Sequence, residues 1–208
     1  MHTRHQHLLR IELRKLRPTQ ITVGYAEVEQ KRRLWSALAK VDREDFLDNH
    51  WFPAVRGPAD SFYIVDHHHL GLALLEEGVS SGYAVLLKDL SALHKDEFWV
   101  VMDHNQWVHP YDAQGQRCPV NDLPRSLKKM ADDPFRSLAG DVRHAGGFPK
   151  EATPFAEFLW ADFFRRRIPR AQLRRDHEGA LRSALTLCHS PEAAHLPGWS
   201  GEVQPLAA

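Results

Sequence analysis

The stretch SFYIVDHHHLGLALLEEG, residues 61–78, places three consecutive histidines between two apolar runs. The aromatic and β-branched residues 61–65 predict a strand. Residues 69–78 predict a helix that is apolar nearly all round, which we expect to be buried and to end at Gly78. Asp66 stands at the joint, where its carboxylate is expected to accept hydrogen bonds from the first N–H groups of the helix. Those N–H groups and the helix dipole also form a natural anion site.

Three roles are open for His67, His68 and His69. They could donate to a phosphate or act as general acid or base near neutral pH, or they could make buried structural hydrogen bonds. The third role is metal binding, but successive helical positions are about 100° apart, so the three rings cannot all face one ion. In an extended chain His67 and His69 would share a face and, with Asp66, form a partial site that lacks a further ligand. The identity of any metal is not indicated.

Composition limits the class of protein. The 208 residues include 27 basic and 27 acidic side chains and 14 histidines, so a polyanion site would have to be local. Cys118 and Cys188 form no CxxC motif, which argues against a disulfide framework or a cysteine zinc site. No signal peptide and no apolar run of about 20 residues is recognisable. We expect a soluble cytoplasmic protein without a membrane partner.

The first half of the chain predicts strands mixed with helices. Strands are expected at 8–13 and 82–90, and a loop or edge strand at 51–60. Helices are expected at 25–41 and 44–51. Residues 96–107 are long enough for a helix, which we favour, although the residues FWVV within them would also suit a strand.

The second half predicts helices. Short helices are expected at 123–131 and 133–146, a firmer one at 153–168 capped by Thr153, and a last one at 178–189. The distribution of strands and helices indicates an α+β fold with a helical C-terminal portion.

Three blocks of the sequence resemble a known family. VDHHHLGLAL, residues 65–74, is similar to the "DGHHR"-like phosphate turn of the ParB/sulfiredoxin fold. LRPTQITVG, residues 16–24, and residues 132–168 resemble the subgroup described as ParB-like nucleases. The resemblance implies an α+β fold with a small mixed sheet, helices and a C-terminal helical extension. It also implies a ParB-like domain over 1–168, helically elaborated from about 120, and a C-terminal helix and tail over 169–208.

The resemblance has departures at the turn. His67 replaces the usual glycine, and Leu70 replaces the arginine that grips phosphate in ParB proteins and sulfiredoxin. His68 stands near the position of the sulfiredoxin catalytic cysteine, so sulfinic acid reductase activity is not expected. No helix-turn-helix segment of the partition-protein type is recognisable, so centromere binding is not expected either.

Other cations would have to supply the charge of the missing arginine. The candidates for phosphate binding are Lys31, Arg136, Arg143 and Lys150. Arg136 could instead pair with Asp132 or Asp133. The resemblance also puts Thr19 and Gln20 in the pocket, although they could simply form a turn.

The resemblance implies a protein that binds a phosphate-bearing ligand, a nucleotide or a nucleic acid. If it is an enzyme, phosphodiester hydrolysis or phosphoryl transfer is the expected reaction. Asp66 would orient a histidine or hold a metal, the three histidines would contact phosphate or move protons, and Lys31 and Arg136 would neutralise charge. Two alternatives are a nucleotide-dependent small-molecule kinase and a non-catalytic binding module. The cofactor is open between Mg²⁺, another divalent cation and a nucleotide, and no oligomeric state is indicated.

Overall fold

The computed structural model describes residues 8–201 and divides the chain into two compact units, Met1–Asp132 and Asp133–Ala208. The division falls after Asp132, whereas the sequence suggested a boundary at 168. The α+β class is confirmed, because unit 1 holds a mixed sheet with helices and the described part of unit 2 is helical.

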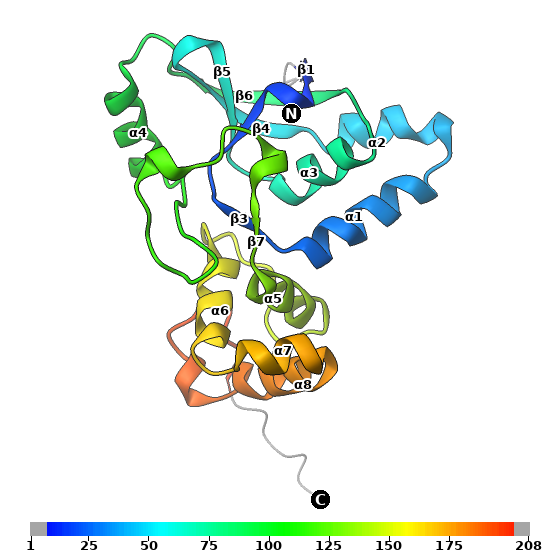
Figure 1. The fold of residues 1–208 in the computed structure, drawn as a ribbon, viewed down its shortest axis with the longest axis vertical. Coiled ribbons are helices and arrows are strands. Elements are labelled where there is room, and N and C mark those ends of the chain that lie inside the picture. Colours follow the sequence, from blue (N-terminus) through cyan, green and yellow to red (C-terminus); the bar gives the residue numbers. More distant parts are fainter. Residues whose placement is uncertain (1–7, 202–208) are drawn as a thin grey trace, which may run out of the picture. The chain divides into compact units, whose positions relative to one another are not determined.

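Unit 1 is built on a five-stranded mixed sheet (Figure 1). In spatial order the strands are β1(Leu8–Glu12), β6(Ser81–Asp89), β4(Phe52–Gly57), β5(Ser61–Ile64) and β2(Leu16–Pro18). β4 runs parallel to β6 and antiparallel to β5, and β2 runs parallel to β5. A separate parallel pair joins β3(Thr22–Val23) to β7(Ala131–Asp132). The helices are α1(Tyr25–Ala37), α2(Arg43–Asn49), α3(His68–Glu76) and α4(Lys95–His104).

The expectation of a loop or edge strand at 51–60 is wrong, because β4 lies inside the sheet between β5 and β6. Proline is normally excluded from inner strands because it cannot donate a ladder hydrogen bond. Pro53 nevertheless takes part through its carbonyl, which accepts the Val65 N–H at 2.9 Å. Its neighbours Phe52 and Ala54 are fully buried. Burial of the flanking side chains therefore outweighs the one donor that Pro53 cannot supply.

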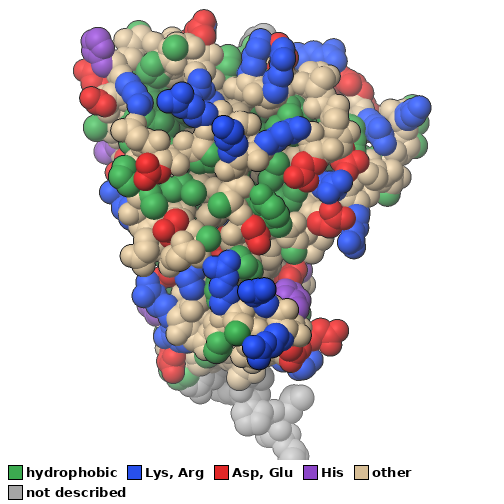
Figure 2. Space-filling model, viewed as in Figure 1, with side chains coloured by type: hydrophobic (Ala, Val, Ile, Leu, Met, Phe, Trp, Pro, Cys, Tyr) green, Lys and Arg blue, Asp and Glu red, His purple; other side chains and the backbone are tan. Residues whose placement is uncertain are grey.

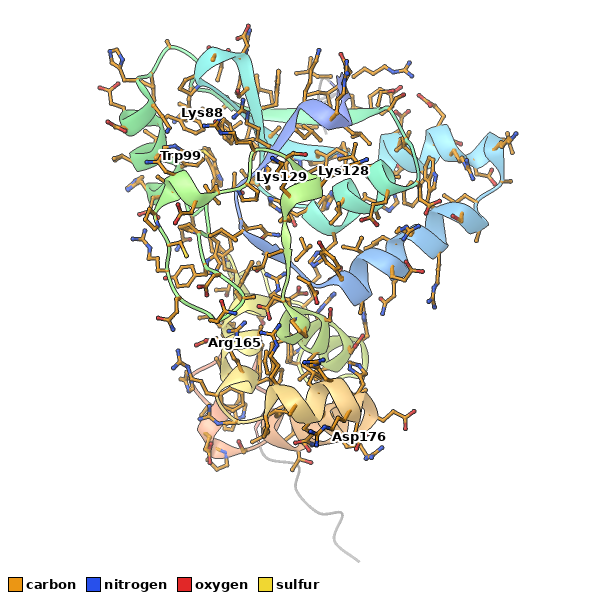
Figure 3. The ribbon with its side chains drawn as sticks, in the orientation of Figure 1. Lys88, Trp99, Lys128, Lys129, Arg165 and Asp176 are labelled. Atoms are coloured by element: carbon orange, nitrogen blue, oxygen red, sulfur yellow. The ribbon has the colours of Figure 1, made fainter. Side chains whose placement is uncertain are left out.

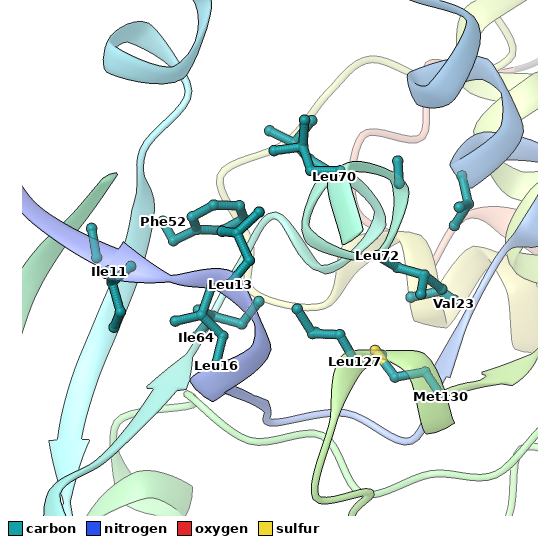
Figure 4. Close-up of a cluster of buried hydrophobic side chains, with 14 of the residues drawn as sticks. Ile11, Leu13, Leu16, Val23, Phe52, Ile64, Leu70, Leu72, Leu127 and Met130 are labelled. Atoms are coloured by element: carbon teal, nitrogen blue, oxygen red, sulfur yellow. The ribbon is translucent and has the colours of Figure 1, made fainter. Parts of the chain in front are cut away.

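One face of the sheet is covered by α1, α2 and α3 and contains the larger core of unit 1 (Figure 4). Leu13, Leu16 and Phe52 are fully buried there, and Leu72 of α3 is 2% exposed. The expectation that α3 is buried is confirmed. Gly78, with φ of +74°, follows the helix in the left-handed conformation expected of a C-terminal glycine.

The other face of the sheet packs against α4. Tyr63 of β5 lies 4.8 Å from Phe98 and 5.3 Å from Trp99, measured between ring centres. Gly57 of β4 lies beneath them, and a Cβ there would come within 2.8 Å of the Phe98 and Tyr63 rings. Successive residues of a strand point to opposite faces, so Tyr63 belongs to the α4 face and Ile64 to the α3 face.

Unit 2 contains α5(Pro134–His144), α6(Ala156–Arg165), α7(Arg170–Arg175) and α8(His177–Cys188). Its core surrounds Trp160, which is fully buried and stacks on Phe148 at 4.4 Å. The Trp160 indole N–H donates to the Pro197 carbonyl at 2.9 Å. Asp176 caps α8 by accepting the Gly179 N–H at 2.8 Å (Figure 3).

Two helix predictions need correction, and one helix was missed. Thr153 does not cap α6, which begins after Phe155 in the left-handed conformation with φ of 59°. The helix expected at 123–131 is reduced to the 3₁₀ turn η5(Leu127–Lys129), followed by β7. α7 was not predicted from the sequence. Among residues 8–201, no helix is long and apolar enough to span a membrane.

We expect the two cysteines to differ sharply in reactivity. Cys188 is fully buried, and this burial raises its thiol pKa from about 9 to about 12. Cys118 is only partly buried. Because the thiolate is the reactive form, a disulfide reagent at pH 8 should modify one thiol per native molecule and two after denaturation. Rapid modification of both thiols in the native protein would contradict the packing of α8.

The stability contribution of Cys188 should depend on alkaline pH. A raised pKa favours the protonated thiol in the folded state, so this contribution is complete below about pH 9 and is lost as the pH rises towards about 12.

Candidate functional site

The turn before α3 contains a strained residue. His67 adopts φ of 63° and ψ of 25°, the left-handed region that glycine occupies without cost. The Asp66 carboxylate accepts the His67 backbone N–H at 2.6 Å. Asp66 is therefore not the N-cap expected from the sequence. α3 begins at His68 with His67 at the N-cap, and Asp66 stabilises the turn itself.

The His67 side chain is oriented by Trp51, which lies between α2 and β4. Its Nδ1 lies 2.9 Å from the Trp51 carbonyl oxygen, and its ring meets Phe52 edge to face at 6.4 Å. A carbonyl can only accept, so Nδ1 is the donor, and in the neutral ring Nε2 carries the lone pair. His67 is exposed, and among the described residues no hydrogen bond reaches its Nε2. The arrangement leaves a basic nitrogen at the start of α3.

His68 points into unit 1 and is 4% exposed. Its Nε2 lies 3.2 Å from the backbone nitrogen of Thr19 and accepts that N–H. The Thr19 hydroxyl donates to the Ile64 carbonyl at 2.9 Å. His68 thus joins α3 to the segment after β2, where the buried Thr19 amide needs an acceptor. Of the three roles open for His68, the structure favours buried structural bonding.

His69 connects the turn to the start of α1. Its Nε2 accepts the Gly24 N–H at 3.0 Å and lies 3.5 Å from a carboxylate oxygen of Glu27. Glu27 was not identified from the sequence. Its only signal there is its position in the first turn of the helix that follows Gly24, where acidic residues favour the dipole.

The three histidine rings therefore diverge to different partners. Within residues 8–201 no group of three His, Cys, Asp or Glu side chains is placed to hold a metal ion. The described residues do not fit a protein-built metal centre at the turn. The structure does bring Thr19 to His68, and Gln20, 6% exposed, follows it in the chain. Lys31 lies one helical turn after Glu27 on α1.

The remaining predicted phosphate ligands belong to unit 2. Arg143 Nε lies 2.7 Å from one Glu157 oxygen, and Arg136 lies 3.6 Å from the other. The Arg136 guanidinium also stacks over the Phe158 ring at 3.5 Å. Lys150 is exposed. Glu157 thus lies between the two arginines and partly neutralises their charge.

Asp133 forms an ion pair with Arg165, and the charge of Arg136 also stabilises its carboxylate. Asp133 is 1% exposed, and its carboxylate also accepts the Phe135 N–H at 3.0 Å as the N-cap of α5. Burial raises the pKa of this carboxyl, and the Arg165 charge opposes that effect. The pair therefore anchors α5 to α6 within unit 2.

Together, the mixed sheet, the strand-to-helix turn and α3 define an α+β protein whose three histidines lie at the start of a buried helix. A family model described as "Putative ParB-like nuclease" matches residues 9–166, so the chain belongs to the ParB-like nuclease family. The chain is similar to the crystal structure of protein Atu1540 from Agrobacterium tumefaciens, with 51% identity and a TM-score of 0.89. That match covers 94% of this chain and 97% of the other. No curated protein matches the chain.

Proposed function

We propose that this protein binds a phosphate of a nucleotide or nucleic acid at the first turn of α3 and hydrolyses a phosphodiester there. The observation that carries the proposal is the orientation of His67. Its Nδ1 is held by the Trp51 carbonyl, which leaves Nε2 as a basic atom beside the helix N-terminus. A histidine in this state is suited to act as a general base near neutral pH.

The N-terminus of α3 would supply part of the positive charge that is missing because Leu70 replaces the family's arginine. The His67 side chain bonds to Trp51 and does not cap α3, so the positive end of the helix dipole is not offset by its own N-cap side chain. Asp66 positions the turn through the His67 N–H. Lys31 would add a cation from α1. Arg136, Arg143 and Lys150 remain proposed phosphate ligands of unit 2 by itself. The two arginines would have to release Glu157 in order to bind a phosphate.

In the proposed reaction His67 Nε2 takes a proton from a water molecule. The water oxygen forms a bond to phosphorus while the bond from phosphorus to the leaving oxygen breaks. The imidazolium then returns its proton to the leaving alkoxide, so protons and charge balance. His68 and His69 take no chemical part, because both of their Nε2 atoms accept backbone N–H groups.

A cleavage assay with end-labelled DNA and RNA oligonucleotides tests the proposal. The His67→Gln variant should lose about 100-fold or more of the rate, the usual contribution of a general base. His104→Gln is the matched control, because His104 is another exposed histidine of unit 1 that lies outside the turn. Parallel assays with Mg²⁺ and with a chelator record any dependence on a divalent cation. Equal rates for His67→Gln and the wild type would contradict the proposal.

A non-catalytic binding module is the second candidate. The structural engagement of His68 and His69 and the presence of Leu70 favour it. Binding of an oligonucleotide that His67→Gln weakens, with no cleavage by the wild type, would assign this function instead.

A further inference from the structure

Unit 1 contains a cleft of about 460 Å³ on the α4 face of its sheet. Its walls include three cations and three aromatic rings: Arg17, Lys95, Arg125, Tyr63, Phe98 and Trp99. Tyr63 points to this face, whereas the neighbouring Ile64 points to the α3 face. The cleft and the histidine turn therefore use opposite faces of the sheet. Cavities of about 300–1,000 Å³ are typical of small-molecule sites.

The charge of the cleft is strongly positive. None of its lining residues is acidic. Among residues 8–201, no carboxylate lies within ion-pair distance of Arg17, Lys95 or Arg125, and Lys95 instead donates to the Asn121 side-chain oxygen at 2.6 Å. Figure 2 shows Lys and Arg side chains gathered among apolar side chains on the upper part of unit 1 in that view. A concave surface with this excess of cations attracts an anion.

The aromatic wall adds a preference for a flat apolar group. Tyr63 and Trp99 meet edge to face, and the Arg17 guanidinium lies 5.9 Å from the centre of the Tyr63 ring (Figure 3 labels Trp99 on α4). Nucleobases stack on aromatic rings and on arginine, while phosphates bind arginine and lysine. A ligand that satisfies both walls carries a planar base and a phosphate together.

The turn between β4 and β5 forms one edge of the cleft and is strained. Ala59 and Asp60 have φ of 55° and 52°, and the Ser61 N–H closes the turn on the Pro58 carbonyl. Left-handed geometry is unfavourable for a residue other than glycine, and such strain concentrates at functional sites. Arg56 Nη2 lies 2.8 Å from the Asp60 carboxylate, which neutralises the acidic side chain of this turn.

We propose that this cleft is a second binding site, specific for a nucleoside 5′-phosphate, either free or at the end of a nucleic acid strand. The phosphate would bind among Arg17, Lys95 and Arg125, and the base would lie against Tyr63 and Trp99. The site is separate from the proposed histidine site and does not depend on hydrolysis there.

Isothermal titration of the full chain tests this site. The probes are AMP, ribose 5-phosphate, adenosine and a 5′-phosphorylated single-stranded tetranucleotide. AMP should bind more tightly than ribose 5-phosphate or adenosine, because only AMP contacts both walls. Arg17→Ala should weaken AMP binding by about tenfold or more, as expected for loss of a charge-assisted phosphate contact. Lys128→Ala is the matched control, because Lys128 is an exposed cation of unit 1 outside the cleft.

The outcomes separate this site from the histidine turn. AMP affinity that falls in Arg17→Ala and is unchanged in Lys128→Ala supports the cleft. Tighter binding of the tetranucleotide than of AMP assigns the ligand to a strand end, and the reverse assigns it to free nucleotides. Absence of AMP binding, an equal loss in Lys128→Ala, or a loss only in His67→Gln would overturn the proposal. Thermal unfolding of each variant confirms that it is folded.

Discussion

Replacing Trp160 with alanine is expected to lower the free energy of unfolding of unit 2 by about 3–5 kcal/mol, the usual cost of removing a buried aromatic side chain. Trp160 is fully buried, stacks on Phe148, and contacts the rings of Phe163 and Phe164. Its indole N–H also bonds the Pro197 carbonyl. Hydrogen exchange of the backbone amides of α5, α6 and α8 would measure the loss within unit 2.

Trp160→Phe is the matched control for this prediction. This variant keeps an aromatic ring against Phe148 but loses the hydrogen bond to the Pro197 carbonyl. The cavity that it leaves is smaller than that of Trp160→Ala. We expect a smaller loss than for Trp160→Ala. Protection of the α5, α6 and α8 amides that is unchanged in Trp160→Ala would show that Trp160 does not organise the core of unit 2.

Replacing His68 with alanine is expected to cost about 3 kcal/mol of stability in unit 1. The change leaves the buried Thr19 N–H without its acceptor, which costs about 1–3 kcal/mol, and it opens a cavity beside α3. Denaturant unfolding followed by circular dichroism measures the loss.

His67→Gly is the control, because it changes the adjacent histidine. Glycine relieves the left-handed strain at this position, worth about 1 kcal/mol, and removes one exposed hydrogen bond of similar size. The net change in stability should therefore be close to zero. If His68→Ala costs no more than His67→Gly, the structural role of His68 is wrong.

The sequence predicted the joint of strand and helix at residues 61–78 because local signals agree there. Aromatic and β-branched residues favour β5, a run of leucines favours α3, and Gly78 ends it. The three family-like blocks predicted the family, which the match over residues 9–166 confirms. The interior position of β4 was missed because Pro53 is a strong local signal, whereas burial of Phe52 and Ala54 is decided by tertiary packing.

The histidine partners could not be predicted from the sequence. Helical geometry predicted that the three rings diverge, but it could not name their partners. His67 bonds to the Trp51 carbonyl, while His68 and His69 accept the backbone N–H groups of Thr19 and Gly24. All three partners are distant from the histidines in the sequence, so only the fold brings them together. The left-handed backbone of His67 had one signal, its place at the glycine of the family turn. No sequence signal predicted the cleft beside α4, because its lining residues, which range from Arg17 to Arg125, come together only in the folded protein.

Backbone amide chemical shifts report phosphate binding at the start of α3 directly. We would titrate ¹⁵N-labelled full-length protein with a phosphorothioate dinucleotide that resists hydrolysis. We expect saturable shifts at the amides of His67 to Gly71 that persist in Arg17→Ala and weaken in His67→Gln. No shift at these amides, or shifts that vanish in Arg17→Ala and not in His67→Gln, would contradict it.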